Sequence, residues 1–274
     1  MASESPRPPR VTDEFAPRTA AVDVHHETRG DLASGTPLVL VHGVGSGLHG
    51  WDGVLAGLPD DLPVIRYDLR GHGRSPAPEG PWSVDDFVAD HLRLLERLGV
   101  ASAHTVGFSL GGLVAQRLAA THPAAVRTLT VVGAVAGRSE QERAAVLARL
   151  EMVRAEGPGG AARRSVERWY SRQYLDAHPG TPQAVVAAMD RLDRTAYTHA
   201  YRVLATTDLA DRLGDIRVPA LAVTGEHDAG SPPRMSRLIA ERTGGRCVVV
   251  PGARHTVLEE RPAIVAKEIA AHVR

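Results

Sequence analysis

Short apolar runs alternate along the chain with segments that have the periodicity of amphipathic helices. The apolar runs, rich in β-branched residues, predict strands at 37–41, 64–67, 104–106, 129–132, 220–224 and 246–250, with an edge strand within 20–28. Helices are predicted at 51–58, 84–98, 110–121, 233–242 and from 262 onward. This alternation predicts an α/β fold with a mostly parallel sheet covered by helices on both faces.

The alternation stops between residues 135 and 215, where the pattern is helical throughout. We therefore expect one α/β core, residues 21–134 and 216–274, that is interrupted by a helical cap at 135–215. Residues 1–20 carry four prolines among charged side chains, and we expect them to form a disordered tail.

Composition and charge exclude several classes of protein. The 274 residues are 43% hydrophobic, enough for a sizeable core. Lys and Arg number 32, as do Asp and Glu, and the zero net charge argues against a general binder of nucleic acid or anionic membranes. Cys247 is the only cysteine, which excludes an internal disulfide and a cysteine-based zinc site. With no membrane-length apolar run and no secretory signal, we expect a cytoplasmic protein without a metal.

Residues 107–112, Gly-Phe-Ser-Leu-Gly-Gly, lie between a predicted strand and a predicted helix. Gly-x-Ser-x-Gly in that place is typical of a nucleophile elbow, a turn so tight that its flanking positions must be small. The turn would present the Ser109 hydroxyl above the sheet, at the positive end of the following helix. We therefore expect Ser109 to be a catalytic nucleophile.

A serine hydroxyl needs an adjacent base, and the base needs an acid to orient it. In this architecture an acid and then a histidine follow the serine along the chain. His255 follows the last predicted strand, where the sites of open parallel sheets gather, and is the expected base. Asp228 follows the strand before it and is the expected acid, with Glu226 as the competing acid.

Two backbone N–H groups must also stabilise the negative charge that develops on the attacked carbonyl oxygen. One belongs to Leu110, directly after the nucleophile. The other comes from the glycine-rich loop 42–47 after the first main strand, where Val44 is the expected donor.

Together these segments resemble the α/β-hydrolase superfamily. Residues 38–132 and 218–270 look like its core, and 135–215 occupies its usual cap position. The motifs that carry the resemblance are at 42–43, 68–75, 107–112, 225–228 and 252–255. A finer resemblance, to 3-oxoadipate enol-lactonases and related esterases, rests on residues 51–52, 66–73, 98–100, 109–116 and 167–170.

The resemblance implies that a small-molecule ester or lactone is cleaved by water through an acyl-enzyme on Ser109, without a metal or an organic cofactor. It also points to Trp169, in the cap, as a substrate-binding residue. Trp51 and Phe108 are expected to line the acyl side of the pocket. An acidic substrate would need a cation from the cap, for which the candidates are Arg138, Arg154 and Arg172.

Two alternatives stay open. The same triad could catalyse hydrolysis of a C–C bond, cofactor-free perhydrolysis or acyl transfer. A non-catalytic receptor of the same fold would bind a small ligand without turning it over, although the intact triad argues against that reading. Turnover of a short p-nitrophenyl ester, together with labelling of Ser109 by a fluorophosphonate, distinguishes an enzyme from a receptor.

Overall fold

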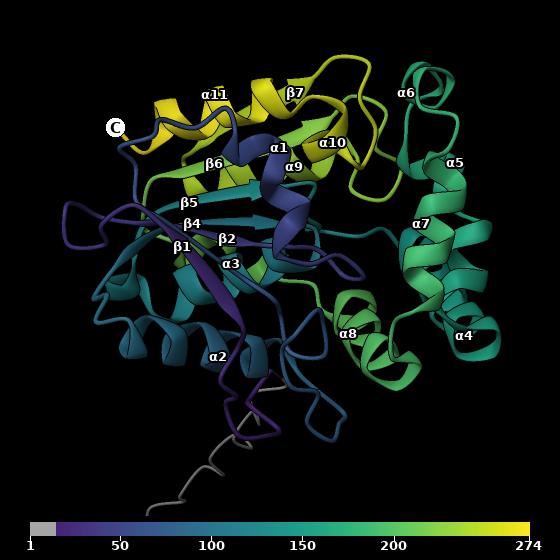
Figure 1. Ribbon diagram of the computed structural model, residues 1–274, viewed down its shortest axis with the longest axis horizontal. Coiled ribbons are helices and arrows are strands. Elements are labelled where there is room, and N and C mark those ends of the chain that lie inside the picture. The colour runs from purple at the N-terminus through teal and green to yellow at the C-terminus, as the bar shows by residue number, and fades with distance from the viewer. Residues whose placement is uncertain (1–14) are drawn as a thin grey trace, which may run out of the picture.

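The computed structural model describes residues 15–274, and a seven-stranded sheet runs through its middle (Figure 1). The strands are β1 (His26–Arg29), β2 (Leu38–Val41), β3 (Val64–Tyr67), β4 (Ala103–Phe108), β5 (Val126–Val132), β6 (Ala220–Gly225) and β7 (Arg246–Val250). They lie in the order β1-β3-β2-β4-β5-β6-β7. β1 is antiparallel to β3, and the other neighbouring pairs are parallel, so the predicted mostly parallel sheet is confirmed.

Helices cover both faces of the sheet and bury two separate apolar layers. The core helices are α1 (Asp52–Leu55), α2 (Val84–Arg97), α3 (Leu110–Thr121), α9 (Pro233–Thr243), α10 (Val257–Glu260) and α11 (Pro262–His272). On one face, side chains of α2, α3 and α9 share a buried apolar layer with Val39 and Val41 of β2. On the other face, α1, α10 and α11 pack against Leu38 and Leu40. Because successive side chains of β2 point to opposite buried faces, its sequence is apolar throughout.

The cap lies beyond the carboxyl ends of the parallel strands (Figure 1). Its helices are α4 (Glu140–Arg163), α5 (Val166–Trp169), α6 (Arg172–Ala177), α7 (Thr181–Asp190) and α8 (Arg194–Thr206). A small apolar cluster that includes Leu150, Val153 and Tyr201 joins α4 to α8. α4 is kinked at Gly157, whose φ is 77°, directly before Pro158.

The last part of the predicted cap packs on the core instead. A 3-10 helix at Ala210–Asp215 contacts α3 and α9, and its Leu213 is fully buried in the same apolar layer. The helical cap therefore ends with α8, before the predicted boundary at residue 216. Helical periodicity shows that a segment has an apolar face, but it does not show whether the cap or the core buries that face.

Residues 15–20, predicted to belong to a disordered tail, lie against α2. The backbone N–H groups of Arg18 and Thr19 donate to Asp86 at 3.0 and 2.8 Å. The prediction is wrong for this part of the tail because a buried carboxylate at the start of α2 holds the backbone in place. Residues 1–14 of the predicted tail lie outside the described residues.

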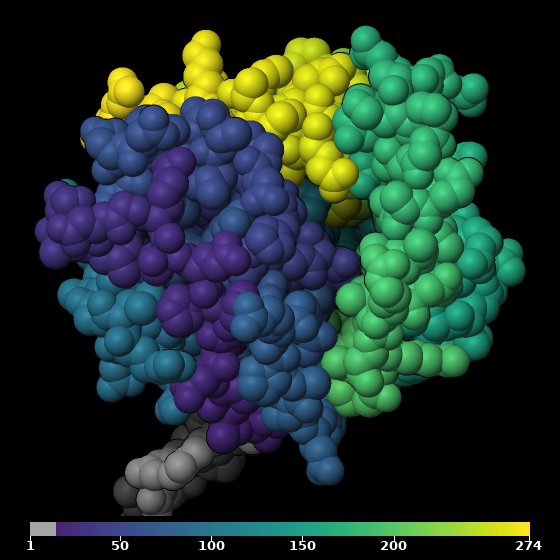
Figure 2. Space-filling model, viewed as in Figure 1, coloured from purple at the N-terminus to yellow at the C-terminus, as the bar shows by residue number. Residues whose placement is uncertain are grey.

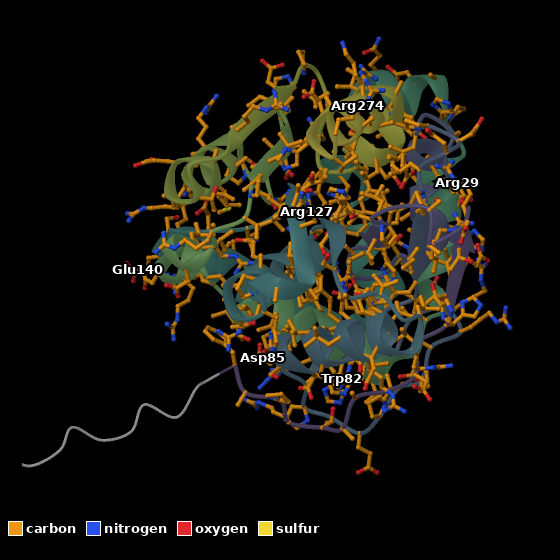
Figure 3. The ribbon with its side chains drawn as sticks, turned by 90° about the vertical axis from the view of Figure 1, so that its left-hand side faces the viewer. Arg29, Trp82, Asp85, Arg127, Glu140 and Arg274 are labelled. Carbon is orange, nitrogen blue, oxygen red and sulfur yellow. The ribbon has the colours of Figure 1, made fainter. Side chains whose placement is uncertain are left out.

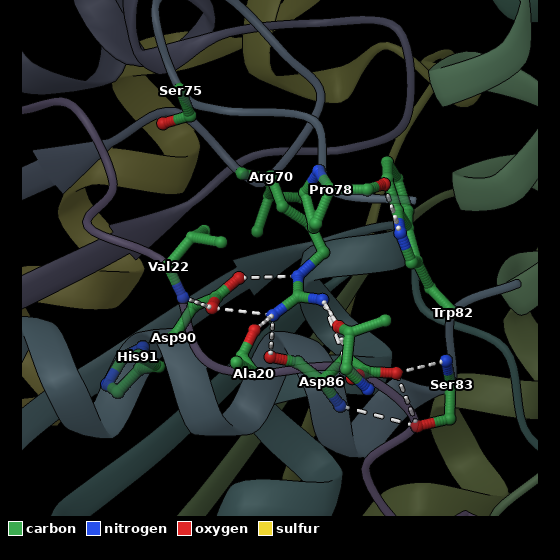
Figure 4. Close-up of polar contacts among 12 residues, drawn as sticks. Ala20, Val22, Arg70, Ser75, Pro78, Trp82, Ser83, Asp86, Asp90 and His91 are labelled. Atoms are coloured by element: carbon green, nitrogen blue, oxygen red, sulfur yellow. Dashed lines mark hydrogen bonds and ion pairs between the residues drawn. The ribbon is translucent and has the colours of Figure 1, made fainter. Parts of the chain in front are cut away.

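Arg70 joins this segment to the loop after β3. Its fully buried guanidinium donates from Nε and Nη2 to Asp90, both at 2.6 Å, and from Nη1 to Thr19 at 2.5 Å (Figure 4). It also lies over the ring of Trp82, 5.9 Å from the centroid. Trp82 and Asp85 appear together at the lower side of Figure 3, where α2 begins. These contacts hold the 68–75 turn, which also contacts the site described below, against α2.

The described residues bear on two further expectations. None of the helices within residues 15–274 is long and apolar enough to span a membrane. In the same part of the chain, no group of three or more His, Cys, Asp or Glu side chains is arranged to hold a metal ion. Cys247, on β7, is a partly buried free thiol.

Candidate active site

Ser109 lies at the sharp turn between β4 and α3. Its backbone has φ 53° and ψ −111°, and it is the one non-glycine residue of positive φ within residues 15–274. A Cβ atom on Gly107 would collide with the carbonyl group of Gly111, and one on Gly111 would collide with the carbonyl group of Val41. Glycine is therefore required on both sides of Ser109, and the close approach of α3 to the strands holds the strained serine in place.

Ser109, His255 and Asp228 form a continuous chain of hydrogen bonds. Nε2 of His255 lies 3.3 Å from the Ser109 hydroxyl oxygen, and Nδ1 lies 2.8 Å from Oδ2 of Asp228. Oδ1 of Asp228 accepts the backbone N–H groups of Gly230 and Ser231 at 2.8 and 2.9 Å. The loops after β4, β6 and β7 thus bring together the three residues that were expected from their positions at strand ends.

Glu226, the competing acid, lies on the same loop as Asp228 but has a different partner. Its Oε2 accepts the backbone N–H of Gly252 at 2.9 Å, and its side chain is 51% exposed. Asp228 is only 2% exposed. Asp228 is therefore the acid in contact with His255.

Burial and the Asp228–His255 contact set the protonation states of the triad. Burial would lower the pKa of His255, but the charge and hydrogen bond of Asp228 outweigh it and raise that pKa above its ordinary value. Burial would raise the pKa of Asp228, but His255 and the amides of Ser231 and Gly230 hold it below its ordinary value. The carboxylate therefore stays ionised at neutral pH and can stabilise the imidazolium that forms when His255 takes a proton.

The loop after β2 brings Val44 to the same cavity wall as Ser109. A Cβ atom on Gly43 would lie 3.1 Å from the Cβ of Ser109, so the two backbones approach closely. Ser46 donates its N–H to the Gly43 carbonyl oxygen at 3.2 Å, which closes a turn around Val44. Leu110 is the first residue of α3, where backbone N–H groups have no partner within the helix.

Two buried histidines connect this loop to the 68–75 turn, each accepting a backbone N–H from the other segment. His72 accepts the Gly45 N–H at Nε2 over 3.0 Å, and His42 accepts the Leu69 N–H at Nε2 over 2.9 Å. Their Nδ1 atoms lie 3.0 and 2.7 Å from carbonyl oxygens of their own segments, so each ring donates there. Burial lowers the pKa of His42 to about 3 and also lowers that of His72. Both rings are therefore neutral, as this pairing requires.

The triad opens into a cavity of about 290 Å³ between the core and the cap. Figure 2 shows the hollow where the green cap meets the blue and yellow parts of the core. Phe108 lines the cavity with its ring against His255 (5.1 Å between centroids), and Trp169 lines it from the cap. Apolar side chains line much of the rest: Val44, Val135, Val146, Val185, Met189 and Leu204. A mostly apolar cavity with a few polar groups is typical of a small-molecule site.

Comparison with protein families identifies the fold to which the chain belongs. The family model described as the alpha/beta hydrolase fold matches residues 36–262. The chain belongs to the α/β-hydrolase family. The predicted fold class is thereby confirmed, and the protein is an enzyme of the hydrolase class.

Among relatives of this α/β-hydrolase, the (E)-2-((N-methylformamido)methylene)succinate hydrolase of Acinetobacter baylyi is 29% identical, and the match covers 83% of this chain and 86% of the relative. The 3-oxoadipate enol-lactonase 2 of the same organism is 28% identical, with 82% and 84% covered. The crystal structure of the enol-lactonase from Burkholderia xenovorans LB400 superposes with a TM-score of 0.84 at 29% identity and covers 93% of this chain and 98% of that chain. The resemblance to enol-lactonases is thus confirmed.

The structure of the hydrolase corrects the prediction made for Trp51. It was expected to bind substrate, but its side chain is fully buried in the apolar layer between the sheet and α1, α10 and α11. It is not among the residues that line the cavity. The short 3-10 helix Leu48–Trp51 turns the indole towards the core, a direction that the motif alone does not specify.

Several cap residues of the cavity wall were not predicted from the sequence. Arg149 and Arg168 line it, as does Tyr201. A signal for Arg149 does exist in the sequence. Glu142, Val146 and Arg149 are spaced by four and three residues on α4 and line the cavity together. Because this helix face mixes charged and apolar residues, a search for apolar periodicity does not identify it.

Proposed function

We propose that this α/β-hydrolase cleaves a carboxylic ester or a lactone with water, through an acyl-enzyme on Ser109. The observation that carries the proposal is the unbroken hydrogen-bond chain from Ser109 through His255 to Asp228 at the wall of an apolar cavity. Serine attack needs a base within hydrogen-bond reach and an acid behind the base, and this chain provides both. The relatives that are named enol-lactonases support an ester-type bond as the bond cleaved.

In the first half of the reaction, His255 takes the hydroxyl proton of Ser109 while the serine oxygen attacks the substrate carbonyl carbon. The backbone N–H groups of Val44 and Leu110 stabilise the negative charge on the carbonyl oxygen. His255 then gives its proton to the leaving oxygen, and the C–O bond breaks. For a lactone, the leaving group stays attached to the acyl chain.

In the second half, a water molecule replaces the leaving group. His255 takes one proton from this water while its oxygen attacks the acyl carbonyl carbon. The new tetrahedral species collapses, the Ser109 oxygen leaves with the proton from His255, and the carboxylic acid is released. Asp228 stays ionised and accepts the hydrogen bond from Nδ1–H throughout. The second imidazole proton therefore stays on Nδ1, and Nε2 is the atom that takes up and releases a proton at each step.

Turnover of short p-nitrophenyl esters and of simple lactones tests the proposal. Ser109→Ala should lower kcat by about 10³-fold or more while the thermal unfolding temperature stays close to that of the wild type. Turnover by Ser109→Ala at the wild-type rate would overturn the assignment of the nucleophile. Labelling of Ser109 without turnover of any ester or lactone would favour a receptor.

A further inference from the structure

The loop that carries His255 also holds the middle of the cap. Thr256, directly after His255, donates its backbone N–H and its hydroxyl to the carbonyl oxygen of Trp169, at 3.1 and 2.9 Å. Figure 2 shows this part of the surface, where the yellow C-terminal segment of the core meets the green cap. Trp169, which lines the cavity, is therefore joined directly to the neighbour of His255.

Glu260, the last residue of α10, holds both sides of this junction. It is only 6% exposed. Its Oε1 accepts the backbone N–H of Arg254 at 2.9 Å, and its Oε2 accepts the backbone N–H of Ser171 at 3.0 Å. One carboxylate therefore fixes the residue before His255 in the core and a residue shortly after Trp169 in the cap.

Two further hydrogen bonds across the junction involve exposed side chains. Arg254 donates from Nη1 to the carbonyl oxygen of Glu167 at 2.6 Å, and Arg261 donates from Nη2 to Gln173 at 3.0 Å. Water can replace either partner of an exposed contact. The Ser171 N–H is buried instead, and without Glu260 the backbone around it would have to shift to reach another acceptor.

The contact between His255 and Ser109 is sensitive to such a shift. Nε2 of His255 lies 3.3 Å from the hydroxyl oxygen, at the long end of the range for a hydrogen bond. Displacement of a reacting group by about 1 Å can cost about 100-fold in rate. A small movement of the loop at residue 254 would therefore impair the proton transfer.

We propose that Glu260 is a positioning residue, which keeps His255 within reach of Ser109 and keeps Trp169 in the cavity wall. The inference rests on the proposed function for the reaction that is measured. Glu260 is not among the described residues that line the cavity. It acts through the two backbone N–H groups that it accepts, one in the core and one in the cap.

The two halves of the inference affect different kinetic constants. His255 takes part in every proton transfer, so its displacement lowers kcat. Trp169 lies where the substrate binds, so its displacement raises KM. A residue that only stabilises the fold would change neither constant in the protein that stays folded.

Glu260→Met tests both halves, because it removes both acceptors and keeps most of the volume of the side chain. With p-nitrophenyl acetate as the substrate, kcat per folded protein should fall about 10- to 100-fold. KM should rise at least about threefold, because Trp169 has lost its fixed place in the cavity wall. Thermal unfolding of the same samples gives the fraction that is folded at the assay temperature.

Acrylamide quenching of tryptophan fluorescence measures the cap directly and needs no turnover. Trp51 and Trp82 are fully buried, whereas Trp169 is partly exposed, so quenching reports mainly on Trp169. Acrylamide should quench Glu260→Met more strongly than the wild type.

Glu226→Met is the matched control. Glu226 also accepts a backbone N–H from the loop before His255, that of Gly252, but this contact is exposed, so water can replace the carboxylate. The kcat, KM and quenching of this variant should stay within about twofold of the wild type. An equal change in Glu226→Met would overturn the inference, because it would show an effect of charge rather than of position.

A pair of variants at Ser171 tests the cap half of the inference in a protein that keeps Glu260. Ser171→Pro removes the N–H that Glu260 accepts, and the φ of −68° at this position suits proline. Ser171→Ala keeps that N–H and loses only the side-chain cap of α6, which Ser171→Pro loses as well. Compared with Ser171→Ala, Ser171→Pro should show stronger quenching and a KM at least about threefold higher, with kcat within about threefold.

Three outcomes decide between the readings. If Glu260→Met unfolds at a lower temperature but keeps the kcat, KM and quenching of the wild type, the inference is overturned, because Glu260 then only stabilises the fold. Identical quenching and KM in the two Ser171 variants would also overturn it. Absence of ester turnover in the wild type, together with stronger quenching of Glu260→Met and Ser171→Pro, would contradict the proposed function alone.

Discussion

Replacement of Asp228 by Asn changes the hydrogen bonding of the triad without changing its shape. Oδ1 of Asp228 accepts two backbone N–H groups, from Gly230 and Ser231, and Oδ2 faces Nδ1 of His255. In Asp228→Asn, only the amide oxygen can accept those two N–H groups, so the amide nitrogen must face His255. That nitrogen is a donor, which forces the His255 proton from Nδ1 to Nε2.

A His255 ring protonated on Nε2 cannot accept the proton of Ser109, whose hydroxyl oxygen lies 3.3 Å from that atom. Holding the base in the wrong tautomer costs about 10⁴-fold in kcat in serine hydrolases with this triad. That factor corresponds to about 5 kcal/mol of activation free energy. The protein should fold as before, because the two backbone N–H groups keep their acceptor.

Steady-state turnover of p-nitrophenyl acetate and thermal unfolding of the same samples provide the assay. Glu226→Gln is the control, because Glu226 is half exposed and contacts Gly252 rather than His255. Its kcat should stay within about twofold of the wild type. If Asp228→Asn kept more than about a tenth of the wild-type kcat, or if Glu226→Gln lost as much activity, the role of Asp228 would be refuted.

Three further results are expected. Because only neutral His255 accepts a proton and its pKa is raised, kcat/KM should fall as the pH drops through a midpoint above 6.5; a midpoint below 6.5 would contradict this. Gly107→Ala should destabilise the fold by more than about 3 kcal/mol in urea unfolding, whereas Gly180→Ala, which has open space around it, should cost less than about 1 kcal/mol. His72→Leu leaves the Gly45 N–H without its acceptor and should lower kcat about tenfold with little change in KM. An unchanged kcat would show that the 68–75 turn does not contribute to catalysis.

The sequence predicted best where local patterns and backbone sterics determine the outcome. The strand at 64–67 and the helix at 110–121 have the predicted bounds. Ser83 caps α2, since Ser83 and Asp86 exchange side-chain and backbone hydrogen bonds. Ser109 lies at the turn between β4 and α3, where a Cβ atom on Gly107 would collide with the carbonyl group of Gly111. Each of these features depends on neighbours in the chain.

The sequence predicted worst where the outcome depends on which distant surface a side chain meets. Trp51 is apolar and lies near the glycine-rich loop, but whether it faces the cavity or the core depends on the orientation of a short 3-10 helix. Residues 15–20 have a polar, proline-containing sequence, and they are held by Asp86, which comes much later in the chain. Arg149 could be distinguished from Arg154 only after α4 had been placed over the cavity.

The most direct test of the account is the location of the covalent adduct formed with a fluorophosphonate. After incubation with the probe, intact-protein mass spectrometry followed by peptide mapping should show one adduct per chain, on Ser109, and a loss of esterase activity that follows the labelled fraction. His255→Ala should label far more slowly, because the serine has lost its base. An adduct on another residue, or full esterase activity in protein that is completely labelled on Ser109, would contradict the account.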